Sequence, residues 1–246
     1  MATDKAPDPP GHPSGVPRTP PAAERTAQGV QRMFDRVAPR YDLANTVFSL
    51  GQDKAWRQAA ARATRLAAGE VAVDVACGTG ALTRELEAIA PGATVAGFDF
   101  SYQMLAHGPG GRFAAGDALQ LPLADAGADV VTIAFGLRNL PEPGQGLLEF
   151  RRVLRPGGRL VVCEFSTPVV PVLRDVYARY LTRLMPVAAR RLTSDPEAYQ
   201  YLARSIGAWP DQPALARWLQ EAGFAEVAWR NLSGGIVALH RGVARP

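Results

Sequence analysis

Apolar and polar positions follow two different periods along the chain from about Val30 onward. Short apolar runs, typical of buried strands, alternate with stretches in which apolar residues recur every three or four positions, as on one face of a helix. The runs that predict strands are Val71–Ala76, Thr94–Phe98, Arg112–Ala115, Asp129–Phe135, Arg159–Phe165, Ala225–Arg230 and Ile236–His240. The helical stretches lie at residues 30–39, Lys54–Leu66, Ala81–Ala90, Tyr102–His107, Gly146–Leu154 and Gln212–Ala222. This alternation predicts an α/β fold with a mostly parallel sheet covered by helices on both faces.

The end of the chain modifies this plan. The last two apolar runs are joined by Asn231–Gly235, a short connection that contains two glycines and predicts a hairpin. The last strand should therefore be antiparallel to its neighbour. A seven-stranded, mostly parallel sheet with an antiparallel terminal strand is the architecture of the Rossmann-like class I S-adenosylmethionine-dependent methyltransferases.

Composition divides the chain into a tail and one domain. Seven of the 21 prolines fall within the first 21 residues, so we expect residues 1–28 to be disordered. This segment has no apolar stretch of the kind found in a signal peptide. Residues 29–246 suit a single domain, in which we expect a helical lid over residues 29–67 and a helical insertion over residues 168–205.

The net charge of +4 does not identify a class of partner. Nearly all of the basic residues are arginines. Only Lys5 and Lys54 are lysines among 27 basic residues, which suggests a coding preference for arginine. Arginine also suits anionic partners, so charge alone does not separate nucleic acid, a membrane surface and no such partner. The sequence contains no run of 18 apolar residues, so it predicts no transmembrane helix. The three histidines form no metal-ligand cluster. We expect a cytoplasmic protein without a metal.

A glycine-rich loop follows the first predicted strand. The stretch V-D-V-A-C-G-T-G, residues 73–80, brings Gly78, Thr79 and Gly80 between a strand and a helix. Glycine lets the backbone turn tightly and approach a ligand closely, and ligands of such sheets lie beyond the carboxyl ends of the strands. The position of the third glycine of a dinucleotide motif is occupied by Thr83, so the loop disfavours a nicotinamide oxidoreductase.

Acidic residues stand at or near the ends of three successive strands. Asp74 lies within the first strand, where it could hold the loop amides or a cofactor ammonium. Asp99 ends the second strand, where a carboxylate can accept both ribose hydroxyls of a nucleoside or cap the helix that follows. Asp117 follows the third strand, suited to an exocyclic adenine amine, with Ala118 offering a backbone amide; the alternative is a turn aspartate. Together they favour a nucleoside cofactor.

Longer segments resemble a known family, the C-methyltransferases of menaquinone and ubiquinone biosynthesis. The similar segments are Tyr41–Arg57, Phe135–Asn139, Arg152–Pro168 and Asn231–Gly242, and the resemblance spans roughly residues 30–242. It implies that S-adenosyl-L-methionine is the cofactor. It also implies methylation of a prenylated demethylmenaquinol to menaquinol, with a ubiquinol precursor as an alternative acceptor.

The resemblance also assigns residues. It gives cofactor contacts to Thr79, Asp99, Asp117 and Ala118. The family usually has a serine before the F-G-L-R-N segment, where this chain has Ala134.

The proposed chemistry requires an electron-rich ring. A neutral phenol, with a pKa of about 10, is a weak carbon nucleophile at neutral pH. We expect Arg138 to stabilise the developing oxyanion and Asn139 to orient the ring; the alternative is that Arg138 pairs with a structural carboxylate. Tyr41, Asp42 and Asn45, in the lid, are the expected substrate contacts, with Asp42 as a second candidate base.

The insertion begins with an amphipathic pattern. Apolar side chains gather near one face of residues 171–185, and three arginines gather on another; these arginines are Arg174, Arg179 and Arg183. The pattern fits peripheral contact with the inner face of the cell membrane or an apolar tunnel, and equally a helix packed on the core. A homodimer is a candidate assembly that the sequence does not decide.

Two other functions are also compatible with the sequence. One is methylation of another phenol or quinone natural product, and another is a non-catalytic protein that binds S-adenosylmethionine. Nucleic-acid methylation is disfavoured because no N/D-P-P-Y/F-type motif and no stripe of alternating aromatic and basic residues is present. We therefore expect no nucleic-acid partner.

Overall fold

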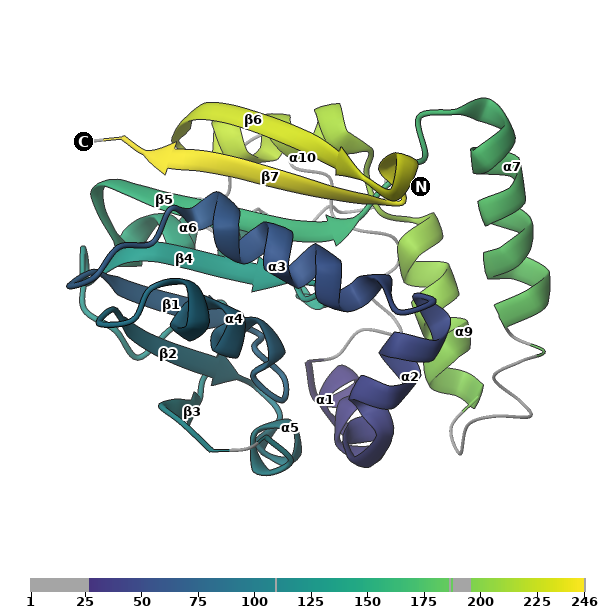
Figure 1. Ribbon diagram of the computed structural model, residues 1–246, viewed down its shortest axis with the longest axis horizontal. Helices are drawn as coiled ribbons and strands as arrows, with labels where there is room; N and C mark the ends of the chain where they lie inside the picture. Colours follow the sequence, from purple (N-terminus) through teal and green to yellow (C-terminus); the bar gives the residue numbers. More distant parts are fainter. Residues whose placement is uncertain (1–26, 109, 186, 188–195, 246) are drawn as a thin grey trace, which may run out of the picture.

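The computed structural model describes residues 27–108, 110–185, 187 and 196–245. Within these residues seven strands form one sheet in the order β3-β2-β1-β4-β5-β7-β6 (Figure 1). The strands are β1 (Val71–Val75), β2 (Thr94–Asp99), β3 (Phe113–Ala115), β4 (Ala128–Ala134), β5 (Leu154–Phe165), β6 (Phe224–Leu232) and β7 (Val237–Ala244). Neighbouring strands are parallel except at β7, which is antiparallel to both β5 and β6. The predicted fold class is confirmed.

Helices cover both faces of the sheet. The helices are α1 (Ala27–Val37), α2 (Tyr41–Phe48), α3 (Gln52–Thr64), α4 (Ala81–Ile89), α5 (Tyr102–Ala106), α6 (Pro143–Val153), α7 (Pro171–Arg179), α9 (Pro196–Gly207) and α10 (Gln212–Glu221). Short 3-10 helices cover Ala38–Arg40, Leu137–Asn139 and Ser233–Gly235, and a π-helix, Tyr180–Leu184, continues α7.

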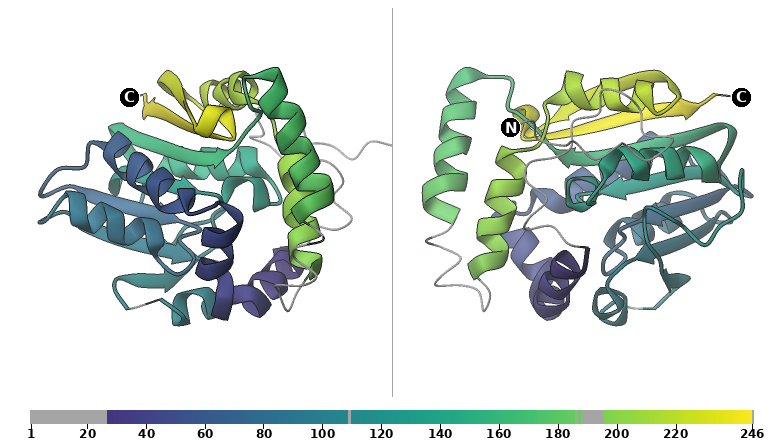
Figure 2. Two further views of the ribbon diagram at one scale, coloured as in Figure 1. Left: turned by 45° about the vertical axis from the view of Figure 1, so that its right-hand side comes forward. Right: turned by 180° about the vertical axis from the view of Figure 1, so that it is seen from behind.

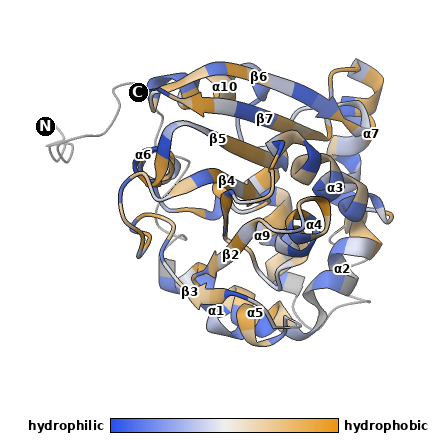
Figure 3. Ribbon diagram, turned by 60° about the vertical axis from the view of Figure 1, so that its left-hand side comes forward, coloured by the Kyte–Doolittle hydropathy of each residue, from blue (hydrophilic) through white to orange (hydrophobic). Residues whose placement is uncertain are grey.

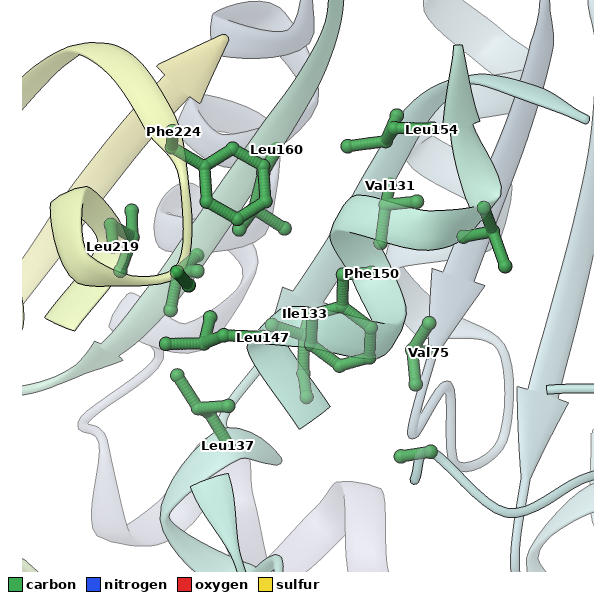
Figure 4. Packing of buried hydrophobic residues seen from close by; sticks show 14 of the residues in the cluster. Val75, Val131, Ile133, Leu137, Leu147, Phe150, Leu154, Leu160, Leu219 and Phe224 are labelled. Carbon is green, nitrogen blue, oxygen red and sulfur yellow. The ribbon is translucent and has the colours of Figure 1, made fainter. Parts of the chain in front are cut away.

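Alternation along the central strands builds two cores. Val131 and Ile133 of β4 point toward α6 and α10 and join the larger core, part of which Figure 4 shows. Val130, on the opposite face of β4, joins a second core with residues of α3 and α4. Because neighbouring strands repeat this two-residue period, each face is apolar and buries a helix layer. In Figure 3 the later part of β5 is hydrophobic, whereas α3 carries hydrophilic stretches.

The strand order reverses between β1 and β4, which are neighbours although β2 and β3 lie between them in sequence. Such a reversal leaves a crevice at the carboxyl ends of the parallel strands, where ligands of open α/β sheets bind. Helices α1, α2, α7 and α9 gather at this end (Figures 1 and 2). Figure 2 shows α7 and α9 side by side, beyond the ends of the strands.

The structure refines several predicted boundaries. The strand predicted over Arg159–Phe165 begins earlier, because Leu154 already pairs with Ala128 of β4. The residues between Leu154 and Arg159 form an irregularity in this pairing. The antiparallel strand is last in sequence, but it lies inside the sheet and β6 forms the edge. Residues 27 and 28, which we assigned to the tail, belong to α1. Residues 1–26 of the predicted tail and residues 186 and 188–195 of the predicted insertion lie outside the described residues.

Candidate functional site

The glycine loop is held open by a carboxylate from the next strand. The backbone N–H of Gly78 donates a hydrogen bond to Oδ2 of Asp99 at 2.8 Å. Gly80, at the start of α4, has φ +81°, and a Cβ there would lie 2.4 Å from the Phe113 ring. The loop therefore requires glycine for both its conformation and its packing.

Asp99 does not cap the helix that follows it, which was our alternative. That role belongs to Ser101, whose Oγ accepts the N–H of Met104 at 3.1 Å. Each Asp99 oxygen accepts one backbone hydrogen bond, since Oδ1 receives the N–H of Ser101 at 2.8 Å. Burial raises the pKa of this carboxyl above its usual value. A carboxylate can accept about four hydrogen bonds, so each Asp99 oxygen retains capacity for a ligand hydroxyl.

A cavity of about 100 Å³ opens beside Asp99. Asp117 and Ala118 line it, together with Met104 and Gly78, so four residues that we predicted to contact the cofactor share one cavity. Oδ1 of Asp117 accepts the N–H of Leu119 at 2.9 Å. This is the turn hydrogen bond that our alternative described, and the exposed carboxylate also faces the cavity. We refer to this space as the nucleoside cavity.

A smaller cavity, of about 30 Å³, lies on the other side of the loop. Thr79 and Asp42 line it, and the Thr79 hydroxyl donates to both Asp42 oxygens, at 2.8 Å and 3.1 Å. It shares Ala76, Gly78 and Ala134 with the nucleoside cavity, so the two are adjacent along the loop. We refer to it as the charged cavity. Asp42, expected as a substrate contact, thus lies against the glycine loop.

Asp74 does not hold the loop amides, contrary to the first of our two alternatives. Its buried oxygens accept hydroxyl hydrogen bonds from Thr83 at 2.7 Å and Thr132 at 2.8 Å. Burial raises the pKa of this carboxyl to about 6. Asp74 ties α4 to β4 beneath the loop, and Thr83, the residue that breaks the dinucleotide pattern, is its partner.

A third cavity is much larger, about 400 Å³, and predominantly apolar. Trp56, Phe135 and Phe165 form one wall, with ring centroids 5.1 to 6.3 Å apart. Helices from the beginning of the chain and from the insertion supply the remaining walls; these residues include Met33, Phe34, Asn45, Phe48, Val176, Tyr177, Tyr180, Leu184 and Tyr201. We refer to it as the apolar cavity. The predicted Asn45 lines it, whereas the side chain of Tyr41 lies outside the described residues.

Arg138 lines the apolar cavity and is also paired with a carboxylate. Its Nη1 lies 2.8 Å from Oε1 of Glu164, and both side chains are buried. The same nitrogen donates to the carbonyl of Phe135 at 2.6 Å, and the guanidinium lies 5.1 Å from the centre of the Phe165 ring. Burial raises the pKa of Glu164, although Arg138 opposes this shift. The carboxylate pairing that we set out as an alternative is present, and it leaves Arg138 facing the cavity.

Asn139 stands where the nucleoside and apolar cavities meet, since it lines both. Its Nδ2 donates to the carbonyl of Phe135 at 3.2 Å, and its Oδ1 accepts the hydroxyl of Tyr201 at 3.2 Å. Phe34 and Phe135 also line both cavities. Phe135 has φ +58°, an uncommon conformation for a residue with a Cβ. A ligand group in the nucleoside cavity can therefore face one in the apolar cavity across these residues.

Several residues of the site escaped sequence reasoning. Tyr201 and Tyr177 come from the insertion, where amphipathic spacing carried the only signal and gave neither residue a role. Burial raises the pKa of Tyr177, whose ring stacks on Tyr180. Arg57 ends the first similar segment, and it lines both the charged and the apolar cavity.

Comparison with known proteins identifies the family. Residues 22–244 match the model of the ubiE/COQ5 methyltransferase family. A Mycobacterium marinum protein named demethylmenaquinone methyltransferase is 53% identical over 223 residues, covering 90% of this chain and 96% of the relative. A Corynebacterium kroppenstedtii protein of the same name is 52% identical over 219 residues, covering 88% and 95%.

Solved structures with the same fold are more distant in sequence. A Thermotoga maritima SAM-dependent methyltransferase has a TM-score of 0.63 at 18% identity, covering 87% of this chain and 99% of that one. Human N-acetylserotonin methyltransferase in complex with SAM has a TM-score of 0.65 at 18% identity, covering 92% and 60%. The fold and the match over residues 22–244 agree with the resemblance of the sequence segments, and the chain belongs to the ubiE/COQ5 methyltransferase family.

Proposed function

We propose that the protein methylates a ring carbon of a prenylated demethylmenaquinol, giving menaquinol, with S-adenosyl-L-methionine as the methyl donor. The observation that carries this proposal is the junction of the nucleoside cavity with the large apolar cavity at Phe135 and Asn139. The relatives named demethylmenaquinone methyltransferase support the choice of acceptor.

The residues around the glycine loop fit the donor. Asp99 offers a half-buried carboxylate with hydrogen-bonding capacity for a ribose diol, and Asp117 and Ala118 offer an acceptor and a backbone donor for adenine. Thr79 and the loop glycines border the charged cavity, toward which the amino-acid end would extend. When bound, S-adenosylmethionine supplies an activated methyl group and leaves as S-adenosylhomocysteine.

Arg138 and Asn139 are the residues that we propose to act on the acceptor. A guanidinium beside the quinol oxygen favours the phenolate and so makes the ring carbon a better nucleophile. Glu164 holds that guanidinium in place through a buried charge-assisted hydrogen bond. Asn139, fixed by Tyr201 and the Phe135 carbonyl, orients the ring beside the donor. The ring carbon gains the methyl group, and its proton passes to solvent.

The outer wall of the apolar cavity suggests where the prenyl tail goes. None of the residues of α7 is buried, and Val172 and Val176 are more than half exposed. Val176 and Leu184 also line the apolar cavity, so the exposed apolar surface is continuous with it. We propose that this surface contacts an anionic bilayer peripherally, with the arginines of α7 and the π-helix near lipid headgroups. No helix in the described part of the chain is long and apolar enough to cross a membrane.

One assay tests the activity. The protein is incubated with labelled S-adenosylmethionine and a short-chain demethylmenaquinol under reducing conditions, and the ring-methylated product is sought by mass spectrometry. A demethylated ubiquinol precursor and an unrelated phenol serve as parallel acceptors. Methylation of only the precursor or the phenol would replace the proposed acceptor, and binding of the donor without turnover on any acceptor would indicate a non-catalytic protein.

Vesicle flotation tests the membrane contact. The protein should float with vesicles containing anionic lipid at low salt, and Val172→Asp with Val176→Asp should abolish flotation while leaving the fold intact by circular dichroism. Sedimentation of the wild-type protein as a dimer that the same substitutions dissociate would instead assign the surface to a second copy of the chain.

A further inference from the structure

The charged cavity contains side chains of both signs. Asp42 comes from α2, Arg57 from α3 and Asp74 from β1, whereas Asp99, Asp117 and Ala118 line only the nucleoside cavity on the other side of Gly78. A site that places a carboxylate and a guanidinium together is complementary to a zwitterion.

Arg57 is the cation of this cavity. Its Nη1 donates to Oδ2 of Asp53, one turn earlier on α3, at 2.6 Å. The guanidinium also lies 5.9 Å from the centre of the Phe135 ring. A guanidinium has five N–H donors in a fixed fork, so the bond to Asp53 leaves donors for a second carboxylate. The Asp53 contact and the Phe135 ring hold the side chain beside the charged and apolar cavities.

Asp42 is better suited than Asp74 to receive an ammonium group. The two oxygens of Asp74 are buried and each accepts a threonine hydroxyl. Asp42 is exposed, and the single hydroxyl of Thr79 is shared between its two oxygens. The lid helix α2 is thus hydrogen-bonded to the glycine loop through Asp42, at the wall of the charged cavity.

We propose that Asp42 and Arg57 bind the two charges of the amino-acid end of the donor, the ammonium at Asp42 and the carboxylate at Arg57. This assignment rests on the proposed function for the identity of the ligand. It makes the charged cavity the subsite that distinguishes an intact donor or its product from a nucleoside that lacks the amino acid.

The position of Asp42 has a second consequence. Asn45 and Phe48 follow on the same helix, three and six residues later, and both line the apolar cavity. A ligand that holds Asp42 therefore also holds a wall of the acceptor cavity. We infer that the donor binds first and that its amino-acid end completes the cavity for the quinol.

Two nucleosides separate the contribution of Asp42 and Arg57 from that of the rest of the donor site. S-adenosylhomocysteine carries the amino-acid end, and 5′-methylthioadenosine carries the adenosine and the thioether without it. Calorimetry on the wild-type protein should show tighter binding of S-adenosylhomocysteine. Arg57→Gln and Asp42→Asn should each weaken it about tenfold or more and leave 5′-methylthioadenosine affinity unchanged. Arg62→Gln, an exposed change on the same helix that borders none of the three cavities, should alter neither affinity.

Each contrary outcome has a distinct meaning. Equal wild-type affinities for the two nucleosides, or parallel losses of both affinities in the variants, would overturn the proposed roles of Asp42 and Arg57. The proposed function would still stand. Failure of the wild-type protein to bind either nucleoside would overturn the proposed function itself.

A second titration tests the order of binding. Quenching of tryptophan fluorescence by menadione, a naphthoquinone without a tail, reports on the cavity that Trp56 lines. S-adenosylhomocysteine should raise menadione affinity about fivefold or more in the wild-type protein. In Asp42→Asn, saturating S-adenosylhomocysteine should not raise menadione affinity. In the wild-type protein, 5′-methylthioadenosine should not raise it either. Menadione affinity that is independent of S-adenosylhomocysteine would rule out the coupling.

Discussion

Arg138 Nη1 and Glu164 Oε1 lie 2.8 Å apart between the ends of two adjacent parallel strands, with both side chains buried. The Glu164 carboxylate makes two further hydrogen bonds, because it also accepts the backbone N–H of Phe165 at 2.8 Å and that of Arg138 at 3.3 Å. The pair therefore fixes the direction of a guanidinium that faces the apolar cavity. Substitution of Arg138 should affect turnover, and substitution of Glu164 should affect stability.

Arg138→Gln should lower kcat for quinol methylation about 100-fold or more, because a donor to a developing oxyanion is lost. The deficit should shrink as pH rises toward the quinol pKa of about 10, where the medium itself forms the phenolate. Initial rates from pH 7 to 9 check this, with S-adenosylhomocysteine binding as the control for an intact fold. Retention of full turnover by this variant would rule out the proposed role.

Glu164→Ala should lower the free energy of unfolding by about 3–5 kcal/mol, since it leaves the buried Arg138 cation without its carboxylate. Urea titration followed by circular dichroism measures the loss. Glu87→Ala, on the exposed side of α4, is the matched control and should change stability by less than about 0.5 kcal/mol. A loss at Glu164 no larger than at Glu87 would mean that the pair contributes nothing to the fold.

Asp74 should make stability fall as pH rises from about 4 to about 6. Its folded pKa is about 6, raised by burial from the ordinary 3.8, so the folded state holds this proton more tightly than the unfolded chain. The stabilisation is complete below pH 4 and is lost as pH passes through the folded pKa, a change of about 3 kcal/mol. Asp74→Asn should lack this loss.

Urea titrations of both proteins at pH 4, 5, 6 and 7 check the Asp74 prediction. Asp99 and Glu164 also have raised pKa values, and they cancel in the difference between the two proteins. A difference that stays constant over this pH range would exclude Asp74 as the titrating group.

Gly80→Ala should cost more stability than Gly69→Ala, although both residues have nearly the same positive φ, +81° and +82°. A Cβ at Gly80 meets the Phe113 ring at 2.4 Å, whereas at Gly69 nothing lies within 4 Å. The strained conformation costs each variant about 1–2 kcal/mol, and overpacking adds about 1–3 kcal/mol at Gly80 alone. Thermal melts check the order, and Phe113→Leu should recover part of the Gly80→Ala loss. Equal melting temperatures for the two alanine variants would contradict the steric account.

Tyr201→Phe should raise KM for the quinol or lower kcat, because Oδ1 of Asn139 loses the hydroxyl that it accepts at 3.2 Å. An unmet hydrogen bond of this kind costs about 1–3 kcal/mol, or roughly 5- to 150-fold in kcat/KM. Tyr180→Phe is the control, since that hydroxyl donates to the Phe48 carbonyl and not to Asn139. Steady-state kinetics on both variants should separate them, and equal effects would show that Asn139 gains nothing from Tyr201.

Local patterns were sufficient to predict the strands and the helices that alternate with them. Apolar runs and glycines act within a few residues, and these determined β1, α4 and β2 within one residue at each end. The interior position of β7 was not predicted, because a hairpin signal gives the direction of a strand relative to its neighbour and not its place in the sheet.

Site residues were predictable where the chemistry is local. Asp99, Asp117 and Ala118 lie at strand ends, and the structure brings them to one cavity. The partners of Asp74 were not predictable, because Thr132 is 58 residues away and no spacing rule joins them. Tyr201 was missed for the same reason, since its contact with Asn139 spans 62 residues.

The place of β7 between β5 and β6 bears on how the protein is made. This strand contributes residues 237–244, yet it separates two strands that precede it in sequence. Until those residues have left the ribosome, β5 and β6 each present an unpaired edge, and such edges promote association with other chains. The sheet therefore becomes continuous only once residues 237–244 have been made, and loss of a few residues near position 240 would split it from within.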